Sequence, residues 1–152
     1  MAKASFVYVT YILSTPEKVF GALLDPELTR QYWGLSRNVS DWKVGSRWEH
    51  QDYEDKTVKV VGKVLESDPP RRLVLTWGSP TNEGQPEKHS RVTFLVESFA
   101  DAVRLTVTHD ELEPESPAMR GISQGWPAIL SSLKTLLESG KPMPMTTRRW
   151  GG

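Results

Sequence analysis

The chain has 152 residues, a length typical of one domain with its own core. Its 19 Lys and Arg residues balance its 19 Asp and Glu residues, which argues against nucleic acid and anionic membrane surfaces as partners. The absence of cysteine excludes disulfides, zinc–cysteine sites and thiol nucleophiles. There is no secretory signal pattern and no apolar run of membrane-spanning length. We therefore expect a cytoplasmic protein without membrane insertion.

The first predicted elements are one strand and two short helices. Residues 5–13 are rich in β-branched and aromatic side chains, which is typical of a strand. Residues 14–17, Ser-Thr-Pro-Glu, supply a capping hydroxyl, a first-turn proline and an acid at the positive end of a helix. Residues 25–27, Asp-Pro-Glu, repeat this start signal, so a second short helix should reach about residue 33.

The middle of the chain is predicted to form consecutive strands. Residues 102–110 alternate most regularly, with Val103, Leu105, Val107 and His109 on one face. Four further strands are expected at residues 46–52, 57–67, 72–77 and 89–99. Alternation on one face, with short turns, predicts an antiparallel sheet with one covered face. Gly62 predicts a bulge or bend within its strand.

A long amphipathic helix is predicted at residues 116–140 and is the only element long enough to cover the sheet. Pro127 predicts a kink or a restart near residues 125–127, and Gly140 predicts a left-handed C-cap. Residues 1–140 are expected to form the single domain, and residues 141–152 a loosely ordered tail. The apolar stripe of this helix comprises Met119, Ile122, Trp126, Ile129, Leu130, Leu133, Leu136 and Leu137.

The fold class predicted from this order is α+β, with a curved antiparallel sheet of about six to seven strands wrapped around the long C-terminal helix. Several segments within residues 5–140 resemble those of a known family. They are Thr15-Pro16-Glu17-Lys18-Val19-Phe20, Leu24-Asp25-Pro26-Glu27, Tyr32-Trp33-Gly34, Val44-Gly45-Ser46-Arg47-Trp48, the segment from Asp68 to Trp77, and the segment from Gly125 to Glu138. In order and spacing they resemble the helix-grip fold of the START-like, Bet v 1-like (SRPBCC) superfamily. Within it, the chain is similar to the bacterial single-domain branch named after the activator of Hsp90 ATPase.

This resemblance implies the fold rather than one activity, because the family is functionally scattered. Members with co-chaperone activity also have a separate N-terminal Hsp90-binding domain, for which the sequence has no room. We therefore do not expect Hsp90 activation.

The gap between sheet and final helix is the candidate site, and we expect it to bind a hydrophobic or amphipathic small molecule. His50 and His109 are predicted to face this gap, where an imidazole can act as general acid or base or orient a ligand. The alternative for each, which we favour, is a structural histidine at a strand end, bonded to a neighbouring carboxylate or water. The expected ligand-binding residues are Trp33, Trp48, His50, Val60, Trp77, Phe94, Leu105, His109, Trp126, Ile129, Leu130 and Leu133.

No cofactor and no metal site are expected, because two histidines fall short of a three-ligand set unless Asp52 or Glu111 joins them. Three functions remain open. The favoured one is a small-molecule binding module. The second is an enzyme, such as a cyclase, dehydratase or hydrolase, with a pocket histidine as base. The third is an interaction protein, either chaperone-linked or stress-linked or a homodimer. A gap filled by side chains would count against the first, and solvent-exposed histidines against the second.

Overall fold

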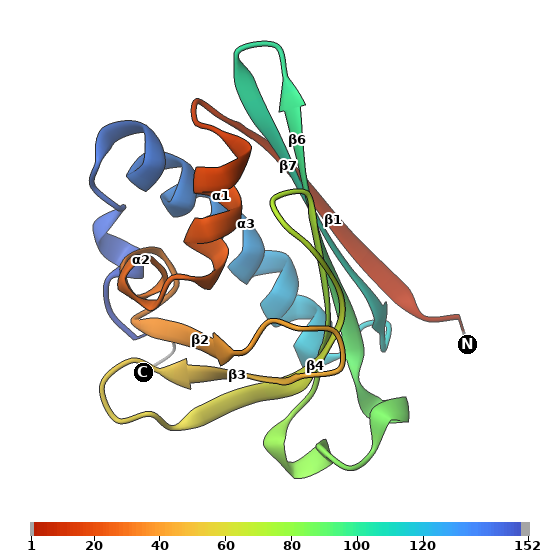
Figure 1. Ribbon diagram of the computed structural model, residues 1–152. Coiled ribbons are helices and arrows are strands. Elements are labelled where there is room, and N and C mark those ends of the chain that lie inside the picture. The colour runs from red at the N-terminus through yellow and green to blue at the C-terminus, as the bar shows by residue number, and fades with distance from the viewer. Residues whose placement is uncertain (1, 150–152) are drawn as a thin grey trace.

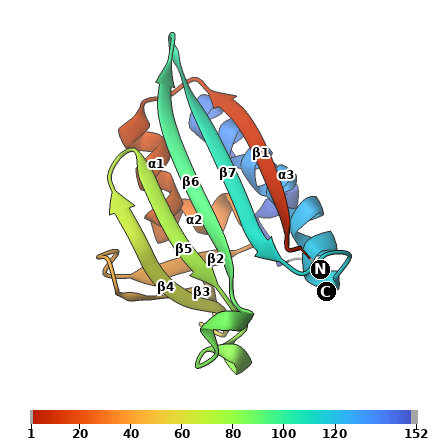
Figure 2. The same cartoon turned by 90° about the vertical axis from the view of Figure 1, so that its right-hand side faces the viewer.

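A computed structural model describes residues 2–149 and has the predicted α+β architecture. A seven-strand antiparallel sheet curves around a long helix, α3 (Pro117–Ser139), as Figure 1 shows. The strand order is β1-β7-β6-β5-β4-β3-β2, and Figure 2 looks onto the sheet with the helices behind it. The strands are β1 (Ala4–Ile12), β2 (Ser36–Ser40), β3 (Arg47–Asp52), β4 (Val58–Asp68), β5 (Arg72–Trp77), β6 (Ser90–Phe99) and β7 (Ala102–Leu112). The remaining elements are α1 (Pro16–Leu24), α2 (Pro26–Tyr32) and three 3₁₀ turns, η1 (Pro80–Asn82), η2 (Pro86–Lys88) and η3 (Pro144–Thr146).

The two predicted helix starts after β1 are confirmed. The Thr15 hydroxyl accepts a hydrogen bond from the Lys18 N–H and caps α1. The Asp25 carboxylate accepts from the Glu27 N–H and caps α2. At the end of α2 the buried Tyr32 hydroxyl donates to the Ala22 carbonyl at 2.9 Å, which ties the two helices together. Both helices lie on the face of the sheet that also carries α3 (Figure 1).

β2 is the strand that the sequence did not predict. It has only five residues, Ser-Arg-Asn-Val-Ser, and pairs with β3 alone at the edge of the sheet. Because such short polar segments have little β propensity, no local pattern identifies them. The pairing with β3 and the bond from the Asn38 amide to the Leu23 carbonyl hold it in place.

Gly62 is needed for a close approach rather than for the predicted bulge. Gly62 pairs regularly with Trp48 of β3. The register of β4 shifts at two other places: against β3 between His50 and Gln51, and against β5 between Val64 and Glu66. A Cβ atom at Gly62 would lie 1.9 Å from the Thr76 carbonyl oxygen and 2.5 Å from the Trp48 indole nitrogen. That indole N–H donates to the same Thr76 oxygen at 2.7 Å, so the space is already used.

The predicted restart of the final helix at Pro127 was wrong, because α3 runs from Pro117 to Ser139 without interruption. A proline inside a helix removes one backbone hydrogen bond. Trp126, Ile129 and Leu130 are buried against the sheet on the same helix face, and this apolar burial outweighs one missing bond. The predicted C-cap at Gly140 is confirmed, with φ of +87°.

Residues 141–149 pack back onto the domain, which corrects the expectation of a loose tail. Thr146 is fully buried, and its carbonyl accepts from the Gly34 N–H at 2.8 Å. Arg149 pairs with the buried Asp52 carboxylate and thereby holds the pKa of Asp52 well below its usual range. We call residues 141–149 the C-terminal strap. Residues 150–152 of the predicted tail lie outside the described residues. None of the helices described is long and apolar enough to span a membrane.

Candidate functional site

The expected gap between sheet and α3 is filled by a cluster of aromatic rings. Trp126 of α3 lies at its centre, with ring centroids 5.3 Å from Trp33, 5.8 Å from Trp77 and 5.8 Å from Phe94. The cluster extends on to the other predicted rings through further pairs between 4.9 and 6.2 Å. We call Trp33, Trp48, His50, Trp77, Phe94, His109 and Trp126 the aromatic cluster.

Most of the predicted wall residues therefore form a packed core. Leu105, Ile129, Leu130 and Leu133 are also buried, at most 5% exposed. Of the twelve residues expected to contact a ligand, Val60 and Trp77 line a pocket at one end of the cluster. The other ten pack against one another, so any contact they make with a ligand stays a prediction.

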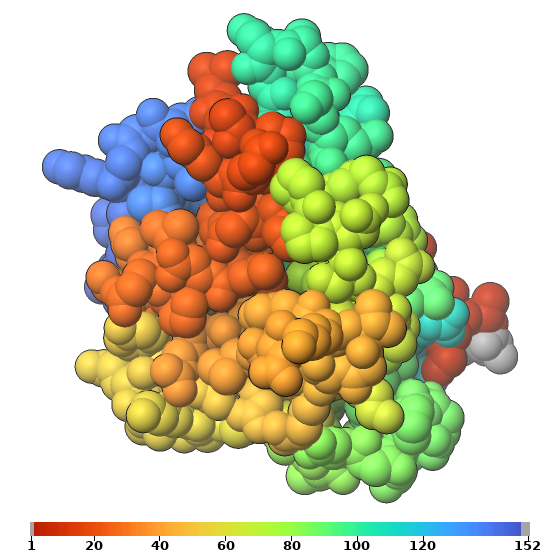
Figure 3. Space-filling model, in the orientation of Figure 1, coloured from red at the N-terminus to blue at the C-terminus, as the bar shows by residue number. Residues whose placement is uncertain are grey.

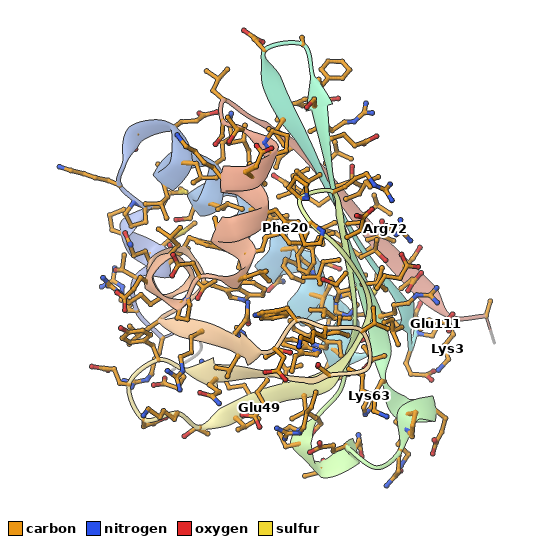
Figure 4. The ribbon with its side chains drawn as sticks, viewed as in Figure 1. Lys3, Phe20, Glu49, Lys63, Arg72 and Glu111 are labelled. Atoms are coloured by element: carbon orange, nitrogen blue, oxygen red, sulfur yellow. The ribbon has the colours of Figure 1, made fainter. Side chains whose placement is uncertain are left out.

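The pocket that Val60 and Trp77 line has a volume of about 600 Å³ and lies where β4, β5 and β7 meet the start of α3. We call it the end pocket. Its apolar wall consists of Val60, Trp77, Leu112, Ala118 and Ile122, and charged side chains from β4, η2 and β7 surround this wall. Figure 4 labels two charged residues of the pocket, Glu111 of β7 and Lys3, which precedes β1.

The loop between β5 and β6 forms one side of the end pocket. It projects at the lower right of Figure 3 and contains η1 and η2. The His89 Nε2 atom lies 2.8 Å from the Asn82 carbonyl oxygen, which ties η1 to the last residue of the loop. The His89 ring also packs on Gly78, where an added Cβ would lie 2.5 Å from it. Glu83 pairs with Arg47 of β3, so the loop is fixed at a second point.

His109 is fully buried, and its hydrogen bonds determine where its proton sits. The Trp126 indole N–H donates to His109 Nδ1 at 3.1 Å. Nδ1 is thus an acceptor, so the neutral ring carries its proton on Nε2 and donates to Ser90 Oγ at 2.7 Å. The Ser90 hydroxyl in turn donates to the Trp77 carbonyl. Burial lowers the pKa of His109 to about 4, against a small opposing effect of Asp110.

His50 is held in the opposite tautomer. The Asn38 amide donates to the Leu23 carbonyl, so its oxygen faces His50 Nδ1 at 2.7 Å and accepts that proton. His50 Nε2 then offers a lone pair, and no residue within 2–149 donates to it. Burial, and secondly the positive charge of Lys59, lower the pKa of His50 to about 3.

These bonds do not arrange Ser90 and His109 as a nucleophile and its base. A histidine activates a serine only when its unprotonated nitrogen faces the hydroxyl. In this structure His109 presents its N–H to Ser90, so it does not serve as that base. The enzyme hypothesis is left with His50, which is buried and only weakly basic at neutral pH. Within residues 2–149, no group of three His, Asp or Glu side chains is placed to hold a metal ion.

Comparison with known proteins identifies the family of the chain. A family model described as "Activator of Hsp90 ATPase homolog 1-like protein" matches residues 14–138. The chain belongs to this family. No curated protein matches it significantly.

Solved structures of other proteins share the fold of this activator of Hsp90 ATPase homolog 1-like chain. Protein MLL2253 from Mesorhizobium loti is 26% identical, with a TM-score of 0.73, over 88% of this chain and 96% of that one. ChR145 from Cytophaga hutchinsonii is 26% identical, with a TM-score of 0.71, over 90% and 95%. The Aha1 protein from Colwellia psychrerythraea, solved as a dimer, is 20% identical, with a TM-score of 0.71, over 91% and 98%.

The end pocket contains residues that sequence reasoning missed. Ile122 was recognised as part of the helix stripe but not as a ligand contact. Ser90, at the start of β6, carries no local signal of its position beside His109. Lys59 was passed over because strict alternation places it on the face of β4 opposite Val60. Only the pairing of strands distant in sequence brings these residues together.

Proposed function

We propose that this chain is a binding module for a small amphipathic molecule, and that the molecule binds in the end pocket. The observation that carries the proposal is the coexistence of about 600 Å³ of space, an apolar wall that includes the Trp77 indole, and a charged rim. Ligand pockets of soluble proteins typically have about 300–1,000 Å³ and combine apolar walls with a few polar groups. In this proposal the ligand lies beside the aromatic cluster rather than within it.

The aromatic cluster has a supporting role in this proposal. Trp77 belongs both to the cluster and to the pocket wall, and its carbonyl and Ser90 join the hydrogen-bond chain of His109 and Trp126. The Trp77 part of the wall is therefore held in place from behind by the cluster. A preformed wall reduces the ordering cost of binding.

Titration with Nile red, an uncharged apolar dye whose fluorescence rises in apolar surroundings, tests this function. We expect saturable binding to the wild-type protein and displacement by decanol. Ala118→Trp places an indole in the end pocket and should weaken dye binding by about tenfold or more. Gln124→Trp adds the same side chain at an exposed position of α3 that does not line the pocket. This variant should bind Nile red as tightly as the wild type does. Equal binding by the two variants would contradict the proposed site.

A further inference from the structure

Lys59 occupies an unusual position in the strand pairing beside the end pocket. β3 and β4 pair in register from Arg47 opposite Lys63 as far as His50 opposite Val60. The next pair is Gln51 opposite Val58, so Lys59 has no partner on β3 and is the extra residue of a β-bulge. Bulges turn a side chain away from the face that strict alternation would give it.

The bulge brings the Lys59 ammonium to the helix-covered side of the sheet. Its Nζ donates to Ser36 Oγ at 3.0 Å, and Ser36 is only 2% exposed. Its charge also acts on the buried His50 ring, whose pKa it lowers further. Lys59 and Val60, although consecutive in the strand, both line the end pocket. Lys59 is exposed as a residue, and its bond to Ser36 holds the ammonium group next to the apolar wall of the pocket.

The other charged residues that line the pocket are two lysines and three glutamates, so the whole lining, with Lys59 included, has no net charge. Lys3 pairs with Glu113, and Glu111 lies 4.0 Å from the Arg91 guanidinium, whose closer partner is Asp110 at 2.9 Å. Glu87 and Lys88 are adjacent residues of opposite charge on η2. Across the described range 2–149, Lys59 forms no ion pair with a carboxylate. An anion from outside the chain is the partner that this ammonium lacks.

We infer that the ligand of the end pocket is an amphipathic carboxylate, whose head group pairs with Lys59 and whose apolar part lies against Trp77 and Ile122. The inference rests on the proposed function. An ammonium has three donors, and Ser36 uses one, so two remain for the two oxygens of a carboxylate. A single charge beside an apolar wall suits a monoanion, since the pairing is less screened there than in bulk water.

Calorimetric titration with decanoate, decanol, decylamine and decyl phosphate at neutral pH tests the inference. The four ligands share one alkyl chain and differ only in the head group. We expect decanoate to bind about tenfold more tightly than decanol, and decylamine to bind most weakly. Added salt should reduce the preference for decanoate over decanol. Decyl phosphate binding more tightly than decanoate would overturn the assignment to a carboxylate.

Three substitutions locate the effect. Lys59→Met keeps the alkyl stem and should make decanoate and decanol bind equally, whereas Lys59→Arg should retain the preference. Lys63→Met removes a lysine of the same strand that does not line the end pocket. This variant should bind decanoate and decanol as the wild type does. If Lys59→Met keeps the preference, or if the wild type shows none, the inference fails while the proposed function stands. If neither Nile red nor any of the four ligands binds, both fail.

Discussion

At the scale of single residues, Trp126 joins α3 to the sheet in two ways. Trp126 is 2% exposed, and its indole packs on the rings of Trp33, Trp77 and Phe94. The indole N–H also donates a hydrogen bond to the buried His109. Packing and hydrogen bonding are separable here, because a phenylalanine keeps much of the ring contact without the donor.

Substitution of Trp126 should separate the two contributions. Trp126→Ala is expected to lower the free energy of unfolding by about 3–5 kcal/mol, because it leaves a cavity among the rings. Trp126→Phe should cost less, about 1–3 kcal/mol, and part of that loss reflects His109 Nδ1 left without its donor. Urea denaturation measures both values. A loss below about 1 kcal/mol for Trp126→Ala would show that the indole is not packed as described.

The two buried histidines should make stability depend on pH. Both have a folded-state pKa below the ordinary 6.5, about 3 for His50 and about 4 for His109. The unfolded chain therefore takes up protons first as the pH falls below about 6.5, and the folded state loses stability. We expect a loss of about 1.5 kcal/mol per histidine between pH 6.5 and about pH 5.

Urea denaturation across this pH range measures the effect. Asp52 does not interfere, because its pKa is lowered and its contribution begins to fade only near its unfolded value of 3.8. His109→Gln should roughly halve the slope of stability against pH. An unfolding free energy that stays constant from pH 6.5 to about pH 5 would contradict the burial of these rings as neutral groups.

At the scale of elements, β4 carries two features that set the shape of the site. Gly62 lets Thr76 of β5 and the Trp48 indole of β3 approach the strand closely, and the bulge at Lys59 turns a lysine toward the end pocket. α3, in contrast, has a glycine without such a constraint. Nothing lies within 4 Å of a Cβ atom added at Gly121.

These two glycines should respond in opposite directions to replacement by alanine. Gly62→Ala is expected to lower the free energy of unfolding by about 2–3 kcal/mol, because the methyl group must displace the Thr76 backbone. Gly121→Ala should raise it by about 0.5–1 kcal/mol through helix propensity. Thermal and urea denaturation compare the two. A neutral Gly62→Ala variant would contradict the close strand contact.

At the scale of the whole molecule, the C-terminal strap connects elements from both ends of the chain. Thr146 lies in a buried network with Ser132 of α3, at 2.7 Å between hydroxyl oxygens, and with the Gln31 carbonyl of α2 at 3.0 Å. The Arg149–Asp52 pair adds a contact with β3. The strap therefore joins α2, α3 and the sheet on the side away from the η1–η2 loop (Figure 1).

Removal of one hydroxyl tests the strap. Thr146→Val keeps the shape of the side chain but leaves buried partners without a hydrogen bond, and should lower the free energy of unfolding by about 1–3 kcal/mol. Thr147→Val is the matched control, since Thr147 is exposed, and should change it by less than about 0.5 kcal/mol. If urea denaturation shows that Thr146→Val lowers the free energy of unfolding no more than Thr147→Val does, the buried hydroxyl of the strap does not contribute to stability.

Local sequence signals predicted most of the architecture. The capping residues Thr15 and Asp25, the alternation in residues 102–110 and the stripe of the last helix act over a few neighbouring positions, so they can be read without the fold. The failures share one cause. β2, the uninterrupted helix through Pro127 and the docked strap each depend on contacts between distant segments.

The features of the candidate site also fall into two groups, those predictable from local sequence and those that depend on tertiary contacts. The sequence by itself determined that aromatic rings and two histidines face the long helix, because side-chain periodicity assigns them to the covered face. Only the tertiary structure decided that these rings fill the gap, and that a pocket lies at its end beside Lys59. Periodicity gives the direction of a side chain, whereas the volume left between side chains depends on strand register, bulges and helix placement, which residues far apart in the chain set together.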